Sequence, residues 1–139
     1  MRLQRNVCFE ITETTAITNW KNASTFIREL KTLGCHFALD DFGSGMSSFG
    51  YLKQLPVEYI KIDGACIKNI LGDRIDQVMV RAICQVSREL GIQTIAEWVE
   101  AADALEKLRE MSVDYGQGHF LHRPEPLPAV AGESAAARN

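Results

Sequence analysis

The chain has 139 residues, of which 46% are hydrophobic and 24% are charged, as expected for one globular domain with its own core. The net charge of -3 excludes a general, charge-driven affinity for nucleic acid polymers. The sequence contains no run of about 18 apolar residues, so we expect no membrane contact by this segment. Four scattered cysteines and no signal-peptide pattern predict a cytoplasmic location, although a longer parent protein could be anchored in a membrane through other domains.

Strand-like and helix-like segments alternate along the chain. The predicted strands are, in order, 6–12, 35–39, 58–63, 93–96 and 115–121. The predicted helices are 20–33, 47–55, 76–90 and 101–111. Gly34 and Gly91 end the two longest helices. Residues 1–124 form the expected domain, and residues 125–139 are predicted to be a disordered tail.

The alternation of strands and helices predicts an α/β fold with a parallel sheet of about five strands. Two architectures fit this pattern: an open doubly wound sheet, and the C-terminal part of a (β/α)8 TIM-type barrel. A whole barrel needs about 250 residues, so the chain would form roughly its second half. A half barrel is expected to expose the apolar inner faces of its strands. The residues expected on those faces are Val7, Phe9, Phe37, Leu39, Ile60 and Ile62.

Polar side chains stand at or near the end of every predicted strand, where parallel α/β proteins carry out their chemistry. They are Glu10, Asp40, Asp41, Lys61, Asp63, Glu97 and Gln117. One acid at a strand end is usually a loop or helix-capping residue, but a succession of five strands is hard to explain by capping. Converging carboxylates repel unless a cation lies between them. Hard oxygen ligands suit Mg²⁺ or Mn²⁺, and two such ions are the usual apparatus for phosphoester hydrolysis.

Four segments carry a resemblance to a known family. They are FEITET (9–14), ALDDFGSGMSSFGYLKQLPVEYIKID (38–63), TIAEWVE (94–100) and DYGQGHFLHRP (114–124). In order and spacing they resemble the EAL family of cyclic di-GMP phosphodiesterases, over nearly all of residues 7–124. The resemblance implies a (β/α)8 barrel, two Mg²⁺ or Mn²⁺ ions, and hydrolysis of cyclic di-GMP to linear pGpG.

The resemblance also implies a role for each polar residue at the strand ends. Glu10 would bind one metal, Asp40 would bridge both metals, and Asp41 would bind the second. Lys61 would orient the attacking water or a phosphate oxygen. Glu97 would act at the water of the second metal, as a ligand or a general base.

Other matched residues are implied to support the site. Gln117 and Asp63 would contact the substrate or the metal ligands. Glu13 would tether a regulatory loop, whose matched residues are Phe42, Gly43, Ser44 and Gly45. In the family this loop lies at a dimer contact, so the resemblance implies a homodimer.

The sequence departs from the family pattern in three places. The Glu-Ala-Leu motif and an asparagine metal ligand are absent from the residues before Glu10. Trp98 stands where the family usually has glycine, and its indole would either close the pocket or stack on a base. We therefore expect this chain to be weakly active or inactive alone, with cyclic di-GMP as its ligand and a second chain completing the barrel.

Two other functions compete with catalysis. The chain could be a non-catalytic, truncated module that serves in cyclic di-GMP binding or dimerisation. A receiver-like phosphoacceptor also clusters aspartates and a lysine at strand ends. The receiver hypothesis is disfavoured because it needs the aspartate pair near the start of the chain. Asp40 and Asp41 instead follow a strand and a helix and precede Gly-Ser-Gly.

Overall fold

The computed structural model describes residues 6–43 and 49–128. Within these residues, five parallel strands form one sheet in the order β1-β2-β3-β4-β5. The strands are β1 (Cys8–Thr12), β2 (His36–Phe42), β3 (Tyr59–Ile62), β4 (Gln93–Ala96) and β5 (Tyr115–Gly116). The predicted α/β class and the five predicted strands are confirmed. The strand order follows the sequence, as it does around a barrel, whereas a doubly wound sheet reverses direction at a switch point.

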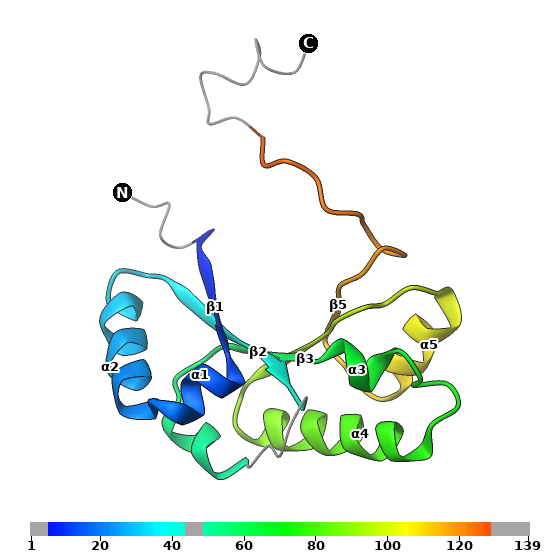
Figure 1. The fold of residues 1–139 in the computed structure, drawn as a ribbon, viewed down its shortest axis with the longest axis horizontal. Coiled ribbons are helices and arrows are strands. Elements are labelled where there is room, and N and C mark those ends of the chain that lie inside the picture. Colours follow the sequence, from blue (N-terminus) through cyan, green and yellow to red (C-terminus); the bar gives the residue numbers. More distant parts are fainter. Residues whose placement is uncertain (1–5, 44–48, 129–139) are drawn as a thin grey trace.

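Helices alternate with these strands. They are α1 (Glu13–Thr18), α2 (Trp20–Lys31), α3 (Gly64–Ile67), α4 (Arg74–Glu89) and α5 (Ala102–Glu110), with a 3₁₀ helix at Phe49–Gln54. Figure 1 shows α2, α4 and α5 along one side of the curved sheet. The short helices α1 and α3 directly follow β1 and β3 and were not predicted, because each is too short to show an apolar period. The 3₁₀ helix replaces most of the helix predicted at 47–55, whose first two residues lie outside the described part.

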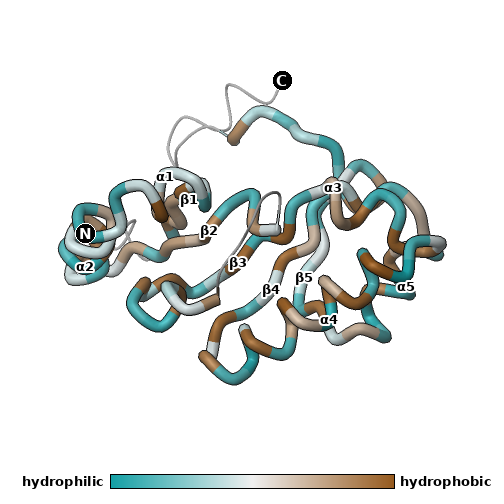
Figure 2. Tube along the Cα trace, turned by 60° about the horizontal axis from the view of Figure 1, so that its bottom comes forward, coloured by the Kyte–Doolittle hydropathy of each residue, from teal (hydrophilic) through white to brown (hydrophobic). Residues whose placement is uncertain are grey.

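The longest helix shows how local signals place an element on the sheet. Its N-cap is Asp73, whose carboxylate accepts hydrogen bonds from the backbone N–H groups of Ile75 and Asp76 at 2.8 and 3.1 Å. Val80 and Ile83 lie at helical spacing on its buried face. Figure 2 shows hydrophobic residues along the central strands, against which α4 packs.

The helix-facing side of the sheet is apolar and buried. Phe37 on β2 is 0% exposed, and its ring meets Phe26 of α2 edge-on at 6.0 Å. Leu39, Ile60 and Ile62 are likewise fully buried on this side. Their expected place on an exposed inner face was wrong, because side chains alternate along a strand and these four take the side that the helices cover. Of the six, only Val7 and Phe9, near the sheet edge, are exposed.

The opposite side of the sheet carries polar and ionisable residues. Register partners of parallel strands share a face, and Glu10 pairs with Ala38, whereas Thr12 pairs with Asp40. Ala38 pairs in turn with Tyr59, and alternate residues of a strand share a face, so Asp40 goes with Ala38 and Lys61 goes with Tyr59. Glu10 and Asp40 are therefore on the same side as Lys61, and this alternation directs the chemistry of the chain to one face.

The last strand is shorter than predicted. The chain leaves the sheet after Gly116 and turns at Gly118, where the N–H groups of Leu121 and His122 donate to the Gly118 carbonyl. A Cβ at Gly118 would lie 2.2 Å from the carbonyl oxygen of Val99, so the turn requires glycine. Residues 125–128 form neither helix nor strand, and the rest of the predicted tail lies outside the described residues.

All four cysteines are free thiols: Cys8 is exposed, and Cys35, Cys66 and Cys84 are buried. Burial raises the pKa of the Cys66 and Cys84 thiols, which keeps them protonated and apolar in character. In the described part of the chain, no helix is long and apolar enough to cross a membrane.

The placement of Phe37 on the helix side makes a testable prediction. Phe37→Ala should lower the free energy of unfolding by about 3–5 kcal/mol, because it opens a cavity between β2 and α2. Urea denaturation would measure it, with Phe120→Ala, a residue 46% exposed, as a control that costs about 1 kcal/mol or less. Equal, small losses of stability for both variants would indicate that Phe37 lies on an exposed face of the sheet.

Candidate active site

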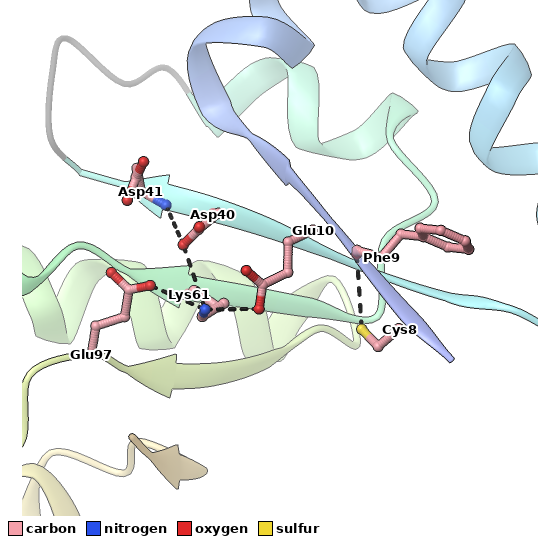
Figure 3. A network of polar contacts seen from close by, with 7 residues as sticks. All are labelled: Cys8, Phe9, Glu10, Asp40, Asp41, Lys61 and Glu97. Atoms are coloured by element: carbon pink, nitrogen blue, oxygen red, sulfur yellow. Dashed lines mark hydrogen bonds and ion pairs between the residues drawn. The ribbon is translucent and has the colours of Figure 1, made fainter. Parts of the chain in front are cut away.

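A buried lysine lies at the centre of the polar face of the sheet. Lys61, on β3, is 5% exposed, and its Nζ donates to Glu10 Oε1 on β1 at 2.8 Å. The same Nζ lies 3.2 Å from Glu97 Oε1, just after β4, and 3.8 Å from Asp40 Oδ1 on β2. Figure 3 shows these side chains converging from four neighbouring segments of the sheet. One ammonium thus joins residues that lie far apart in sequence.

The surrounding charges set the protonation of this cluster. Burial alone would lower the pKa of Lys61, but hydrogen bonds to Glu10 and Glu97 raise it, so the amine stays charged. Burial, followed by the neighbouring Asp40, raises the pKa of Glu97 to about 7. Burial acts in the same direction on Asp40, yet hydrogen bonding to Glu97 and to the Asp41 N–H, together with Lys61, lowers its pKa. The pKa of Asp40 is therefore lower than that of Glu97.

A β-bulge brings the adjacent Asp40 and Asp41 to the same site. The register joins Leu39 to Ile60 and Phe42 to Ile62, so β2 has one residue more than β3 in this interval. Asp41 takes a left-handed backbone conformation, with φ of 56°, and its N–H donates to Asp40 Oδ1 at 2.9 Å. In a regular strand the two side chains would point to opposite faces. The bulge interrupts this alternation, so the carboxylates of Asp40 and Asp41 reach the same site.

Three carboxylates form a group that fits a divalent cation. Asp40, Asp41 and Glu97 each offer an oxygen, and these oxygens lie within 4.8 Å of one another. Burial raises the pKa of Asp41, and the charges of Asp40 and Asp63 raise it further, which shows that several acids lie close together here. An all-carboxylate donor set is the kind that Mg²⁺ and Mn²⁺ prefer. The residues present therefore fit such an ion.

Glu10 is not one of the three acids whose oxygens all lie within 4.8 Å of one another. Its carboxylate, with a side chain 48% exposed, pairs with the far side of Lys61. Lys61 thus lies between Glu10 and Glu97 in Figure 3. The structure brings Glu10 to the site that the sequence predicts for it, where its carboxylate contacts Lys61 and lies close enough to Asp40 to affect the pKa of that residue.

Glu13, the first residue of α1, contacts the start of the predicted regulatory loop. It is only 4% exposed. Its Oε2 accepts from the Gly43 N–H at 3.4 Å, and its Oε1 accepts from the Tyr51 hydroxyl at 2.7 Å. Gly43 has φ of 95°, which favours glycine. Ser44 and Gly45 lie outside the described residues. Sequence analysis missed Tyr51, because nothing local pairs a tyrosine of a short helix with a glutamate 38 residues earlier.

Asp63 and Gln117 border the site through their backbones. The Asp63 N–H donates to the Phe42 carbonyl at 2.9 Å, which holds the end of β2 against the end of β3. The Gln117 N–H donates to the Ala96 carbonyl, and the Gln117 carbonyl accepts from Val99. These contacts fix the strand ends on both sides of Glu97.

The fold and this edge define a class of protein: a parallel half barrel with a lysine-centred acidic site at the carboxyl ends of its strands. A family model described as the EAL domain matches residues 2–124. The chain belongs to the EAL domain family, and the resemblance found in its motifs is confirmed.

Relatives and solved structures agree with this assignment. Cyclic di-GMP phosphodiesterase PdeB of Shewanella oneidensis is 49% identical over 121 residues, which are 87% of this chain and 14% of that protein. Cyclic di-GMP phosphodiesterase PdeA of Borreliella burgdorferi is 43% identical over 123 residues, 88% of this chain and 18% of that protein. The structure of the PaMucR phosphodiesterase in complex with c-di-GMP matches with a TM-score of 0.83 at 34% identity, over 88% of this chain and 50% of that chain. The chain thus spans about half of a matched structure and less than a fifth of these relatives.

The bulge at Asp41 predicts an unequal response to two uncharged substitutions. Asp41→Val should be less stable than Asp41→Asn by about 1–2 kcal/mol, because a β-branched residue resists the left-handed conformation that asparagine tolerates. Chemical denaturation would measure the difference. The same pair of substitutions at the exposed, helical Asp103 should differ by about 0.5 kcal/mol or less. Equal stability of the two Asp41 variants would contradict the strained bulge.

Proposed function

We propose that this edge of the sheet is the catalytic edge of a phosphodiesterase domain that hydrolyses cyclic di-GMP to linear pGpG with Mg²⁺ or Mn²⁺. The observation that carries the proposal is the buried Lys61 with Glu10, Asp40 and Glu97 around it. Membership of the EAL family, with relatives named cyclic di-GMP phosphodiesterases, supports the choice of substrate.

Asp40, Asp41 and Glu97 are the residues proposed to hold metal, since their oxygens are already gathered. Glu10 is proposed as a further ligand in the complete domain, where its half-exposed carboxylate faces more of the barrel. A divalent ion bound there would supply an activated water and neutralise charge on the phosphate.

The residues of the chain itself position the reacting groups. An ammonium has three N–H donors, and Glu10 and Glu97 engage two of them. Asp40 Oδ1 lies 3.8 Å from Nζ, beyond hydrogen-bond distance, so the third donor of Lys61 is proposed to hold a phosphate oxygen or the attacking water. Glu97, fixed between Lys61 and Asp40, is proposed to orient that water or accept its proton. Both roles depend on Lys61 and Glu97 being held close together by the strands that carry them.

The bordering residues are proposed to maintain this geometry. Glu13 would hold the loop that begins at Phe42 and Gly43, through its contacts with Gly43 and Tyr51. Asp63 and Gln117 would keep the ends of β3 and β5 in place beside the substrate.

A second candidate is a non-catalytic module that binds cyclic di-GMP or dimerises. It applies first to the 139-residue chain taken alone, which spans about half of the matched phosphodiesterase structure. Binding of cyclic di-GMP without release of pGpG, by the full-length protein with metal supplied, would select this candidate.

The catalytic proposal predicts a large loss on neutralising one acid. In the full-length protein, Asp40→Asn should lower the rate of pGpG formation by more than about 100-fold, because it removes the charge shared by Lys61 and the acidic group. Chromatography of the products would measure it, and a chelator should abolish the wild-type rate until Mg²⁺ or Mn²⁺ is added back.

The matched control is Asp103→Asn, on the exposed surface of α5. It should keep the wild-type rate. A near wild-type rate for Asp40→Asn would refute the assignment of the site, and turnover that survives the chelator would refute the proposed metal. The 139-residue chain alone should be weakly active or inactive, since it carries half of the matched domain structure.

We also propose that a second copy or another chain completes the barrel. Within the described residues, β1 and β5 end the strand order, so each has one edge without a strand beside it. Light scattering of the 139-residue chain should therefore show association that grows with concentration. Val7→Lys, at the exposed β1 edge, should weaken it, and Leu127→Lys, 93% exposed, should not. A monodisperse monomer at low micromolar concentration would contradict completion of the barrel by a second copy.

A further inference from the structure

Trp98 follows Glu97 directly and holds an unusual position. Its backbone is left-handed, with φ of 58°, a conformation that bulky residues rarely adopt. Its neighbours are pinned: the Glu97 N–H donates to the Ile62 carbonyl at 3.2 Å, and the Val99 N–H donates to the Gln117 carbonyl at 3.0 Å. The surroundings therefore hold Trp98 in this conformation.

The indole of Trp98 lies flat on Gly64, the first residue of α3. A Cβ at Gly64 would lie 2.1 Å from Cδ2 of the ring, and 2.4 and 2.5 Å from its bonded neighbours Cγ and Cε3. An approach above one ring atom, with two of its bonded neighbours only slightly farther, is an approach to the face of the ring. Only glycine leaves room for the ring, so one face of the indole packs against Gly64.

The remainder of the ring is open. Trp98 is 56% exposed, although Gly64 beneath it is buried. Since Trp98 follows Glu97 and Gly64 follows Asp63, the ring lies at the carboxyl ends of β3 and β4, on the edge of the sheet that carries the acidic group. One face of the indole packs against Gly64, and more than half of the residue is exposed at the edge of the site. Such an aromatic surface is suited to stacking on a planar ligand.

We propose that Trp98 is a stacking platform for a guanine base of the nucleotide whose phosphodiester lies at Asp40, Asp41 and Glu97. This inference rests on the proposed function, because a cyclic dinucleotide brings a purine close to each phosphate. Gly64 is part of the platform, since it fixes the height and the tilt of the indole. The role is one of substrate binding and positioning; proton transfer stays with the acids and Lys61.

The chain has two tryptophans, which makes the platform directly observable. Trp20→Phe leaves Trp98 as the sole indole, and Trp98→Phe leaves Trp20, at the start of α2, as the matched control. With Mg²⁺ present, titration of the 139-residue chain with cyclic di-GMP should quench the fluorescence of the first variant and leave the second unchanged. Ribose 5-phosphate, which has no base, should quench neither.

Equilibrium dialysis with labelled cyclic di-GMP supplies a second measurement. Trp98→Gly should bind at least about 5-fold more weakly than the unsubstituted chain, as expected for loss of a stacked base, and Trp98→Phe should fall between them. Glycine accepts a positive φ, so Trp98→Gly should keep its fold, which thermal denaturation would check.

The outcomes separate the two proposals. Binding that is unchanged in Trp98→Gly, with silent Trp98 fluorescence, would overturn the platform and leave the proposed function intact. No binding of cyclic di-GMP by the full-length protein, with metal supplied, would overturn both. Loss of self-association in Trp98→Gly, with nucleotide affinity unchanged, would assign the indole to a protein interface instead.

Discussion

The ion pairs of Lys61 are the constraint on which the site depends. A charged amine that is 5% exposed must be compensated, and here carboxylates from β1, from β2 and from the segment after β4 all face it. Removing any one partner would leave unbalanced charge in a poorly solvated place, so the strands that carry these residues are coupled through a single side chain. The need to compensate the charge of Lys61 is also consistent with the separation of polar and apolar residues onto opposite faces of the sheet. Apolar residues such as Phe37 and Ile60 pack under the helices, and the polar set is left to the other side.

The bulge in β2 allows the adjacent residues Asp40 and Asp41 to reach the same site. Alternation along a strand separates neighbours, and the extra residue between Leu39 and Phe42 cancels that separation. The strain of the left-handed Asp41 is offset by surrounding contacts, such as the hydrogen bond between the Asp63 N–H and the Phe42 carbonyl. Glu13 joins the same region from α1 and ties Gly43 to Tyr51. The end of β2 is therefore held from two sides, which suits a site whose acids must keep a fixed spacing.

The edge of the sheet combines charge and aromatic surface within a few residues of chain. Glu97 points to Lys61, whereas the next residue, Trp98, turns onto Gly64. The left-handed backbone at Trp98 makes this divergence possible, as the one at Asp41 makes convergence possible. Two residues in strained conformations thus frame the candidate site, in keeping with the tendency of functional sites to store such strain.

Local sequence determined the order of the strands and longer helices, because apolar periodicity, glycines and caps act over a few residues. It also indicated that Glu10, Asp40, Lys61 and Glu97 meet, since parallel strands share a carboxyl edge. Tertiary structure alone decided which face Phe37 and Leu39 take, how Asp41 turns, that Glu10 sits across Lys61, and that Trp98 rests on Gly64. These features depend on register and on contacts between residues far apart in the chain, such as Tyr51 and Glu13, and no local pattern encodes them.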